Sequence, residues 1–229
     1  MTHIGVDWRP ERTADRLVLT PRGDLDTTMV SAVRDDLVAF AVDQPRAIII
    51  VLDHLRIRSR DALAAFAPAW RWPVVPILLV AADRGLDTTR GPSVHVSLEA
   101  ALAELGDIPP LRQADIVLRP VEPSSRRARL FVRATCQRWD LTDLTPDAVT
   151  VATELVENSI IHAATDLRLQ LQPCDGGLVV AVRDGSPRLA MPRKDGRPGG
   201  LSMVAYLADE WGCTPDAVGG KVSWAVLAV

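Results

Sequence analysis

The chain has 229 residues, of which 48% are hydrophobic and 24% charged, and its formal net charge at pH 7 is −3. This length suits one large domain or two small ones, and so small a net charge gives no reason to expect a nucleic acid as a direct partner. The three cysteines, Cys136, Cys174 and Cys213, lie far apart without metal-ligand spacing, which indicates reduced thiols. No apolar run is long enough to span a bilayer and the first residues lack a signal-peptide pattern, so we expect a soluble, cytoplasmic protein that does not contact a membrane.

The first half of the chain alternates the patterns of strands and helices. A short strand within 16–25 ends in a turn at Arg22–Asp24, and Asp26 or Thr27 can cap the helix that follows. Ser97 caps the last helix of this half and Gly106 stops it. Together these elements predict a compact α/β unit. The other predicted strands lie over residues 46–53 and 74–82, and the predicted helices over 27–42, 60–70 and 97–105.

Residues 106–113, GDIPPLRQ, interrupt this alternation with a glycine and two prolines. These residue types break helices and strands alike, so we place a domain boundary here.

The second half combines helices with strands that read as a mixed or antiparallel sheet. The two strands on either side of CDGG form a hairpin. Thr145 caps a long helix and Pro146 sits in its first turn. The predicted strands lie over residues 114–120, 166–173, 176–185 and 219–229, and the predicted helices over 123–139 and 144–164 and within 197–212.

The segment TELVENSIIHA, residues 153–163, carries Glu154, Asn158 and His162 at steps of four along a helix that is otherwise largely apolar. On a helical wheel the three residues lie along one margin of the core-facing side. A margin residue can be partly desolvated and still reach a cavity, which suits a base or a metal-binding amide. The alternative is a polar, half-exposed helix edge without a function. For His162 we expect a packed, hydrogen-bonded histidine.

Two further stretches support the functional interpretation of this helix. Asp184 and Gly185 end a strand in VRDGSP, and Gly199 and Gly200 directly precede a helix in RPGGL. Backbone amides at a helix N-terminus favour phosphate, and glycine lets the chain approach it closely.

The order of these pieces resembles the ATP-binding fold shared by gyrase, Hsp90 and histidine kinases, known as the GHKL or Bergerat fold. Within it, residues 114–229 are most similar to the bacterial anti-sigma-factor serine/threonine kinases, on TELVENSIIHA, VRDGSP and GGLSMVAYLADEWG. The resemblance implies ATP and Mg²⁺ as cofactors.

The same resemblance implies a role for each matching residue. Glu154 would be the catalytic general base on the attacking hydroxyl, and Asn158 would hold Mg²⁺. Asp184 would accept the adenine amino group, with Gly185 leaving room for the ring. Gly199 and Gly200 would contact the phosphates.

Two positions depart from the pattern of this family. Pro198 stands where a first loop glycine is usual, and it has no N–H to offer a phosphate. Val222 follows Lys221 where the family commonly has a threonine that supports adenine binding. Ser223 would turn to the opposite face of its strand, so it is not an obvious substitute.

Residues 16–106 resemble the small STAS domain of anti-sigma-factor antagonists, on RGDLD, IIIVLDHLRI and VSLEAALAEL. That family is phosphorylated on a Ser or Thr directly after an Asp that matches Asp61, but Ala62 follows it here and offers no hydroxyl. Ala64 replaces the glycine two residues further on, and Ser59 is a weak alternative acceptor. We therefore expect a docking or dimerising module that has lost its phosphorylation switch.

The resulting hypothesis has three parts along the chain. Residues 1–108 form a degenerate STAS-like domain, 109–122 form the linker and the first strand of the next domain, and 123–229 form a histidine-kinase-like ATP-binding domain. Such a protein would regulate transcription by partner switching.

Two functions follow from this hypothesis. The first is a serine/threonine kinase that phosphorylates the antagonist domain of another protein. The alternative is a module that sequesters a sigma factor or an antagonist, with nucleotide binding structural or absent; a simple ATPase is a third option. The resemblance also implies a possible homodimer.

Overall fold

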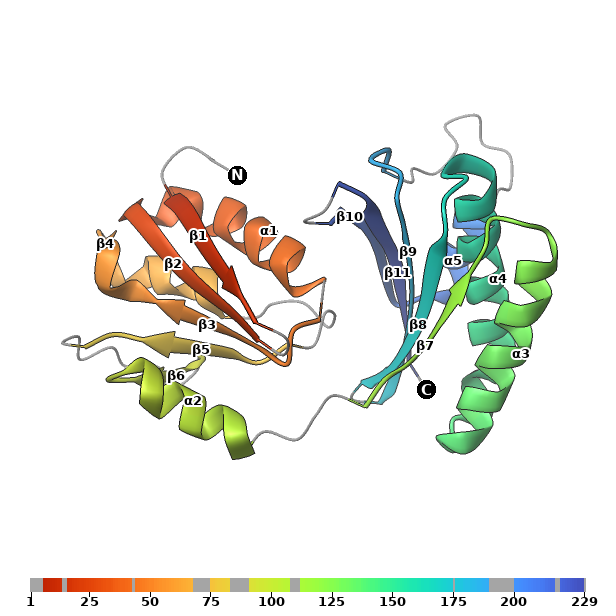
Figure 1. Cartoon of the computed structure of the whole chain (residues 1–229), viewed down its shortest axis with the longest axis horizontal. Coiled ribbons are helices and arrows are strands. Elements are labelled where there is room, and N and C mark those ends of the chain that lie inside the picture. Colours follow the sequence, from red (N-terminus) through yellow and green to blue (C-terminus); the bar gives the residue numbers. More distant parts are fainter. Residues whose placement is uncertain are drawn as a thin grey trace. The chain divides into compact units, whose positions relative to one another are not determined.

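The structure is a computed structural model that describes residues 6–13, 16–42, 44–67, 75–82, 91–107, 112–174, 176–189, 200–216 and 219–228. The chain divides into two compact units, Met1–Pro110 and Leu111–Val229, and this division falls inside the proline-containing segment 106–113. Each unit contains its own sheet, as Figure 1 shows.

The first unit is built on a sheet with the order β1-β2-β3-β5-β6, in which β4 also pairs with β2. The β1–β2 pair is antiparallel and the other pairs are parallel. Alternate residues of β3 point into two different apolar clusters, so this strand is buried on both faces, as its continuous apolar run predicts. The strands are β1 (Val6–Arg12), β2 (Arg16–Leu25), β3 (Ala47–Val51), β4 (Leu55–Ile57), β5 (Ile77–Val80) and β6 (Ser93–His95).

Helices cover both faces of this sheet. Helix α1 (Val30–Ala41) packs Val33 and Leu37 into one cluster, and α2 (Leu98–Asp107) packs Ala101 and Leu105 into the other. The Oγ of Ser97 accepts a hydrogen bond from the Ala100 amide at 3.2 Å, which confirms the predicted cap. The sequence from Arg60 to Phe66 forms 3-10 turns rather than an α-helix.

Three further features of this unit differ from the sequence predictions. Strand β2 continues through Arg22–Asp24, because Gly23 adopts a φ of 115° and lets the strand continue without a turn. Strand β1 was not predicted, since its Arg9-Pro10-Glu11 core lacks apolar alternation; a proline is tolerated there because β1 lies at the sheet edge. Gly106 lies within α2 instead of stopping it.

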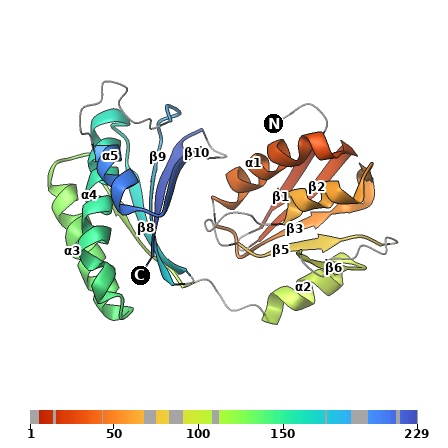
Figure 2. The ribbon, with the colours of Figure 1, turned by 180° about the vertical axis from the view of Figure 1, so that it is seen from behind.

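The second unit contains a sheet with the order β10-β11-β9-β8-β7, in which every neighbouring pair is antiparallel. The predicted hairpin is formed by β8 and β9, and Gly176 in its turn has a φ of 67°. Figures 1 and 2 show the labelled helices of this unit on one face of the sheet. The elements are β7 (Ala114–Leu118), α3 (Pro123–Arg138), α4 (Thr145–His162), β8 (Leu167–Cys174), β9 (Gly177–Asp184), α5 (Gly200–Leu207), β10 (Glu210–Pro215) and β11 (Lys221–Ala228).

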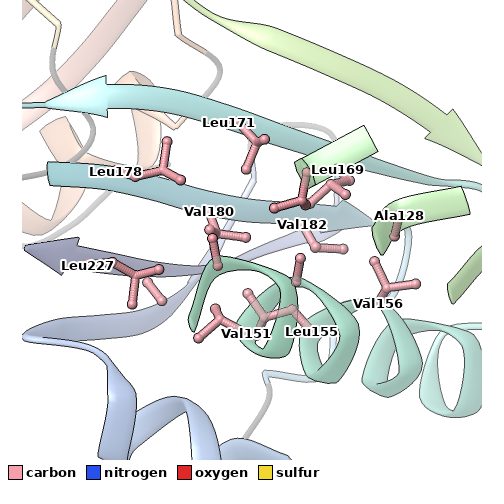
Figure 3. Close-up of a cluster of buried hydrophobic side chains, with 14 of the residues drawn as sticks. Ala128, Val151, Leu155, Val156, Leu169, Leu171, Leu178, Val180, Val182 and Leu227 are labelled. Atoms are coloured by element: carbon pink, nitrogen blue, oxygen red, sulfur yellow. The ribbon is translucent and has the colours of Figure 1, made fainter. Parts of the chain in front are cut away.

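The core of the second unit lies between this sheet and α4. Figure 3 shows Val151 and Leu155 of α4 facing Val180 and Val182 of β9, and all four side chains are almost fully buried. The helices thus cover one face of the antiparallel sheet, and the predicted fold class, two α/β units with helices on one face of the second sheet, is confirmed.

Two predictions for the second unit need correction. Thr145 does not cap α4: it is the first helical residue, and its hydroxyl donates to the Leu141 carbonyl instead. Glu210–Pro215 forms β10, an edge strand whose first three residues fall within the range 197–212 that was predicted to contain the preceding helix. Within the described residues, no helix is both long and apolar enough to cross a bilayer.

Candidate functional site

Helix α4 presents a buried face and a polar margin. Its buried side chains include Leu155, Val156 and Ser159, while Glu154 and Asn158 are half-buried beside them. The predicted margin position of Glu154 and Asn158 is therefore confirmed. His162 is exposed, so the expectation of a packed histidine is wrong; as the last residue of α4, it lies beyond the apolar core.

Asp184, at the end of β9, is 2% exposed and is held by three hydrogen bonds. Its Oδ1 lies 2.7 Å from the Lys221 Nζ and accepts from the Ser186 amide at 2.9 Å. Its Oδ2 accepts from the Ser159 hydroxyl of α4 at 2.7 Å. The lysine is itself 1% exposed, so the two groups form a buried ion pair. The contacts of Lys221 and Ser159 with Asp184 were not predicted from the sequence.

The pairing register of the sheet explains why Lys221 reaches Asp184. On β11, Lys221 pairs with Asp184 and Val222 pairs with Arg183. Side chains alternate along a strand, so Lys221 and Ser223 point toward the helices and Val222 points away from them. Lys221 is thus the residue beside Asp184. Val222, which occupies the position where the family commonly has a threonine, is not beside it.

Close backbone packing shapes this end of the sheet. The Gly185 amide donates to the Thr165 hydroxyl at 2.9 Å, and a Cβ at Gly185 would lie only 3.1 Å from the Thr165 methyl group. The Gly220 amide donates to the Asp216 carboxylate at 2.8 Å. A Cβ at Gly220 would collide with the Asp184 carbonyl oxygen, so glycine is needed there.

Gly220→Ala is expected to destabilise the second unit by about 1–3 kcal/mol, because the new methyl group would push β11 away from β9 and disturb the Asp184 contacts. Urea denaturation measured by circular dichroism checks this. Gly106→Ala is the matched control, since a Cβ at Gly106 meets nothing within 4 Å and alanine favours a helix. Equal midpoints for the two variants would contradict the expected clash.

A cleft of about 320 Å³ opens beside the same strand ends. The Arg183 guanidinium on its wall pairs with Asp216 at 3.2 Å. The described residues that line it belong to β7, to the start of β8, to the end of β9 and to the turn before β11. None of these described residues belongs to α4, so this cleft does not join Asp184 to Glu154 and Asn158.

The glycine loop can be described only in part. Gly200 begins α5, while Pro198 and Gly199 lie outside the described residues, so phosphate binding by this loop stays a prediction. Among the residues that the structure describes, no three His, Cys, Asp or Glu side chains gather as a metal site. The magnesium role of Asn158 likewise stays a prediction.

The residues around Asp184 do not fit adenine recognition in this arrangement. The side chain of Asp184 is 0% exposed, and both of its oxygens already accept hydrogen bonds from the chain itself. An adenine amino group needs an accessible acceptor. The geometry around Asp184 therefore supports no catalytic step through ATP.

Burial raises the pKa of Glu154, and the nearby charge of Glu157 raises this pKa further. The folded chain thus holds this proton more tightly than the unfolded chain does. The stability that this proton contributes is fully present below about pH 4 and is lost as the pH rises through the folded-state pKa.

Glu154→Gln should therefore stabilise the chain at pH 7, by about 0.5 kcal/mol, the size of one like-charge pair on a helix. At pH 3 the variant and the wild type should be equally stable. Urea denaturation at the two pH values measures the difference in unfolding free energy between the variant and the wild type. Glu157→Gln is the control, because Glu157 is exposed and its substitution removes only the repulsion between the two carboxylates. A stabilisation of the same size at pH 3 would rule out ionisation of Glu154 as its cause.

In the first unit, the position matching a phosphorylation site holds no hydroxyl. Ala62 is fully buried, and the preceding Asp61 is exposed. The Oγ of Ser59 accepts from the Asp61 amide at 3.3 Å and caps the 3-10 turns that follow. Ser59 thus has a local structural role.

Comparison with known proteins finds no matching family model and no similar curated protein. Among solved structures, the chain is similar to the RsbU and RsbW domains of a Mycobacterium tuberculosis protein, with a TM-score of 0.41 and 20% identity over 52% of this chain. The chain spans 33% of the length of that structure. It is also similar to an anti-sigma factor antagonist from Mycobacterium paratuberculosis, with a TM-score of 0.34 and 19% identity over 44% of this chain and 95% of that one.

Proposed function

We propose that the chain is a regulatory protein of the anti-sigma-factor type that acts by binding a protein partner, and that this binding does not require a nucleotide. The partner is a sigma factor or an antagonist-domain protein, as in partner-switching regulation of transcription. The main support for this proposal is the burial of Asp184. The carboxylate that would have to recognise adenine is buried in an ion pair with Lys221.

The outward face of α3 supports partner binding. Arg126, Arg127 and Arg133 are exposed there, and Leu130 between them is 58% exposed. The spacing of three to four residues places these side chains along one face of the helix. A basic face with an apolar residue in its centre suits an acidic partner helix that carries an apolar residue, because charge steers such an encounter and the apolar contact adds affinity.

The test is direct binding to purified candidates. Each sigma factor and each single-domain antagonist of the source organism is titrated against the immobilised chain by bio-layer interferometry, without nucleotide and with excess MgATP. We expect one partner to bind equally well under both conditions. The charge-reversed variant Arg126→Glu/Arg133→Glu should bind it at least tenfold more weakly, a loss of about 1.4 kcal/mol.

Arg22→Glu is the control for this variant, because Arg22 is exposed on the first unit and lies outside α3. If no candidate binds, or if binding requires MgATP, the proposal is wrong.

A second candidate function, a protein serine/threonine kinase, is favoured by Glu154. Its half-buried position and raised pKa suit a general base, because such a base works best when its pKa approaches the working pH. The substrate would be the antagonist domain of another protein, since Ala62 leaves this chain without the acceptor.

Incubation with labelled ATP, Mg²⁺ and the candidate antagonists decides whether the chain is a kinase. Phosphate transfer by the wild type that is lost in Glu154→Gln would establish the kinase. Phosphate transfer by the wild type that does not exceed the background given by Glu154→Gln would exclude it.

A further inference from the structure

We infer that Lys221 is an internal ligand of Asp184: its ammonium group fills the place on the carboxylate that a purine amino group would take, and so excludes adenine from the second unit. This inference rests on the proposed function and explains why partner binding would not require a nucleotide.

The acceptor sites of Asp184 are nearly all used. A carboxylate offers about four lone-pair sites. Oδ1 accepts from both the Lys221 Nζ and the Ser186 amide, and Oδ2 accepts from the Ser159 hydroxyl. A single site on Oδ2 is left, on a side chain that is 0% exposed. An incoming amino group would therefore have to displace a donor that belongs to the chain.

The displacement of Lys221 is unfavourable for a reason of charge. The Lys221 ammonium gives the Asp184 carboxylate both a hydrogen bond and a counter-charge, whereas the adenine amino group is neutral and could give only the hydrogen bond. The Lys221 side chain is 2% exposed, so an ammonium that lost Asp184 would stay desolvated without a counter-charge. A hydrogen bond from the uncharged adenine amino group would leave both Asp184 and Lys221 without a counter-charge.

The backbone holds the lysine in this place. The register of β9 and β11 sets Lys221 directly opposite Asp184. Gly220 lies against the Asp184 carbonyl with no room for a Cβ, and Asp216 holds the Gly220 amide. The start of β11 is thereby fixed, and the lysine side chain points at the carboxylate.

Lys221→Thr tests the inference. Threonine keeps a hydroxyl that can donate to Asp184 but removes the ammonium and shortens the side chain. Calorimetric titration with MgATP and with adenosine, which has no phosphates, is carried out on the full chain. Val222→Thr on the opposite face of β11 is the matched control, because it adds the same residue type without touching the Lys221–Asp184 pair.

We expect Lys221→Thr to bind adenosine at least tenfold more tightly than the wild type, whereas Val222→Thr behaves as the wild type. Tight binding of adenosine by the wild type that is lost in Asp184→Ala, which has no side-chain acceptor, would overturn the inference. So would the absence of binding by a folded Lys221→Thr variant.

If Lys221→Thr does not fold, Asp184→Asn/Lys221→Thr provides the same test, because it removes both buried charges and keeps a carbonyl acceptor. This double variant should bind adenosine more tightly than the wild type, and an unchanged affinity would also overturn the inference. Partner binding is measured on the same samples. An unchanged adenosine affinity of the variants together with partner binding by the wild type refutes the role of Lys221 alone, whereas the absence of partner binding by the wild type refutes the proposed function.

Discussion

Lys221→Met is expected to destabilise the second unit by about 3–5 kcal/mol, because it leaves the Asp184 carboxylate buried without its counter-charge. The two partners are 1% and 2% exposed, so water cannot replace the lost interaction. Ser159 and the Ser186 amide remain as donors, but neither carries a positive charge. Hydrogen exchange of the β8 and β9 amides measures this loss in the second unit alone, which matters because a two-unit chain need not unfold in one step.

The neutral double variant Asp184→Asn/Lys221→Met separates the cost of the unpaired charge from the loss of packing. It should recover most of the stability, because replacing both members of a buried ion pair by neutral groups of similar size is often nearly neutral. Equal destabilisation by the single and the double variant would mean that packing, rather than charge, accounts for the effect.

Leu155→Ala is the second large expected effect, a loss of about 2–5 kcal/mol. Leu155 of α4 is 1% exposed and its side chain packs against the sheet. Removal of this side chain leaves a cavity beneath the helix that carries Glu154 and Asn158. The same hydrogen exchange measurement reports the loss.

Leu130→Ala is the matched control for this substitution, since Leu130 is 58% exposed on α3. It should change stability by less than about 0.5 kcal/mol and weaken partner binding instead. A stability loss in Leu130→Ala as large as that in Leu155→Ala would contradict the assignment of Leu130 to a free surface.

The sequence predicts most of the second unit because its elements depend on local patterns. Helix α4 follows from apolar periodicity, and the strict alternation of β8 gives its buried face. Asp184 at a strand end and the half-buried margin of Glu154 follow from the same patterns. The edge strand β10 was missed, because Glu210–Pro215 follows α5 closely and lacks clear alternation.

The decisive contact of the candidate site could not be predicted from local patterns. Lys221 lies 37 residues after Asp184, and only the register of β9 with β11 brings the two together. A shift of one residue would have placed Val222 beside the carboxylate instead. Ser159 was missed for a similar reason: a small polar residue in a helix gains meaning only when its partner across the core is known.

The affinity of the wild-type chain for its partner, measured in matched buffers with and without MgATP, tests nucleotide-independent binding most directly. With Asp184 held by Lys221, the two dissociation constants should agree within experimental error. A tenfold or larger change on addition of MgATP, present in the wild type and absent in Asp184→Ala, would contradict nucleotide-independent binding and would place a working adenine site at Asp184.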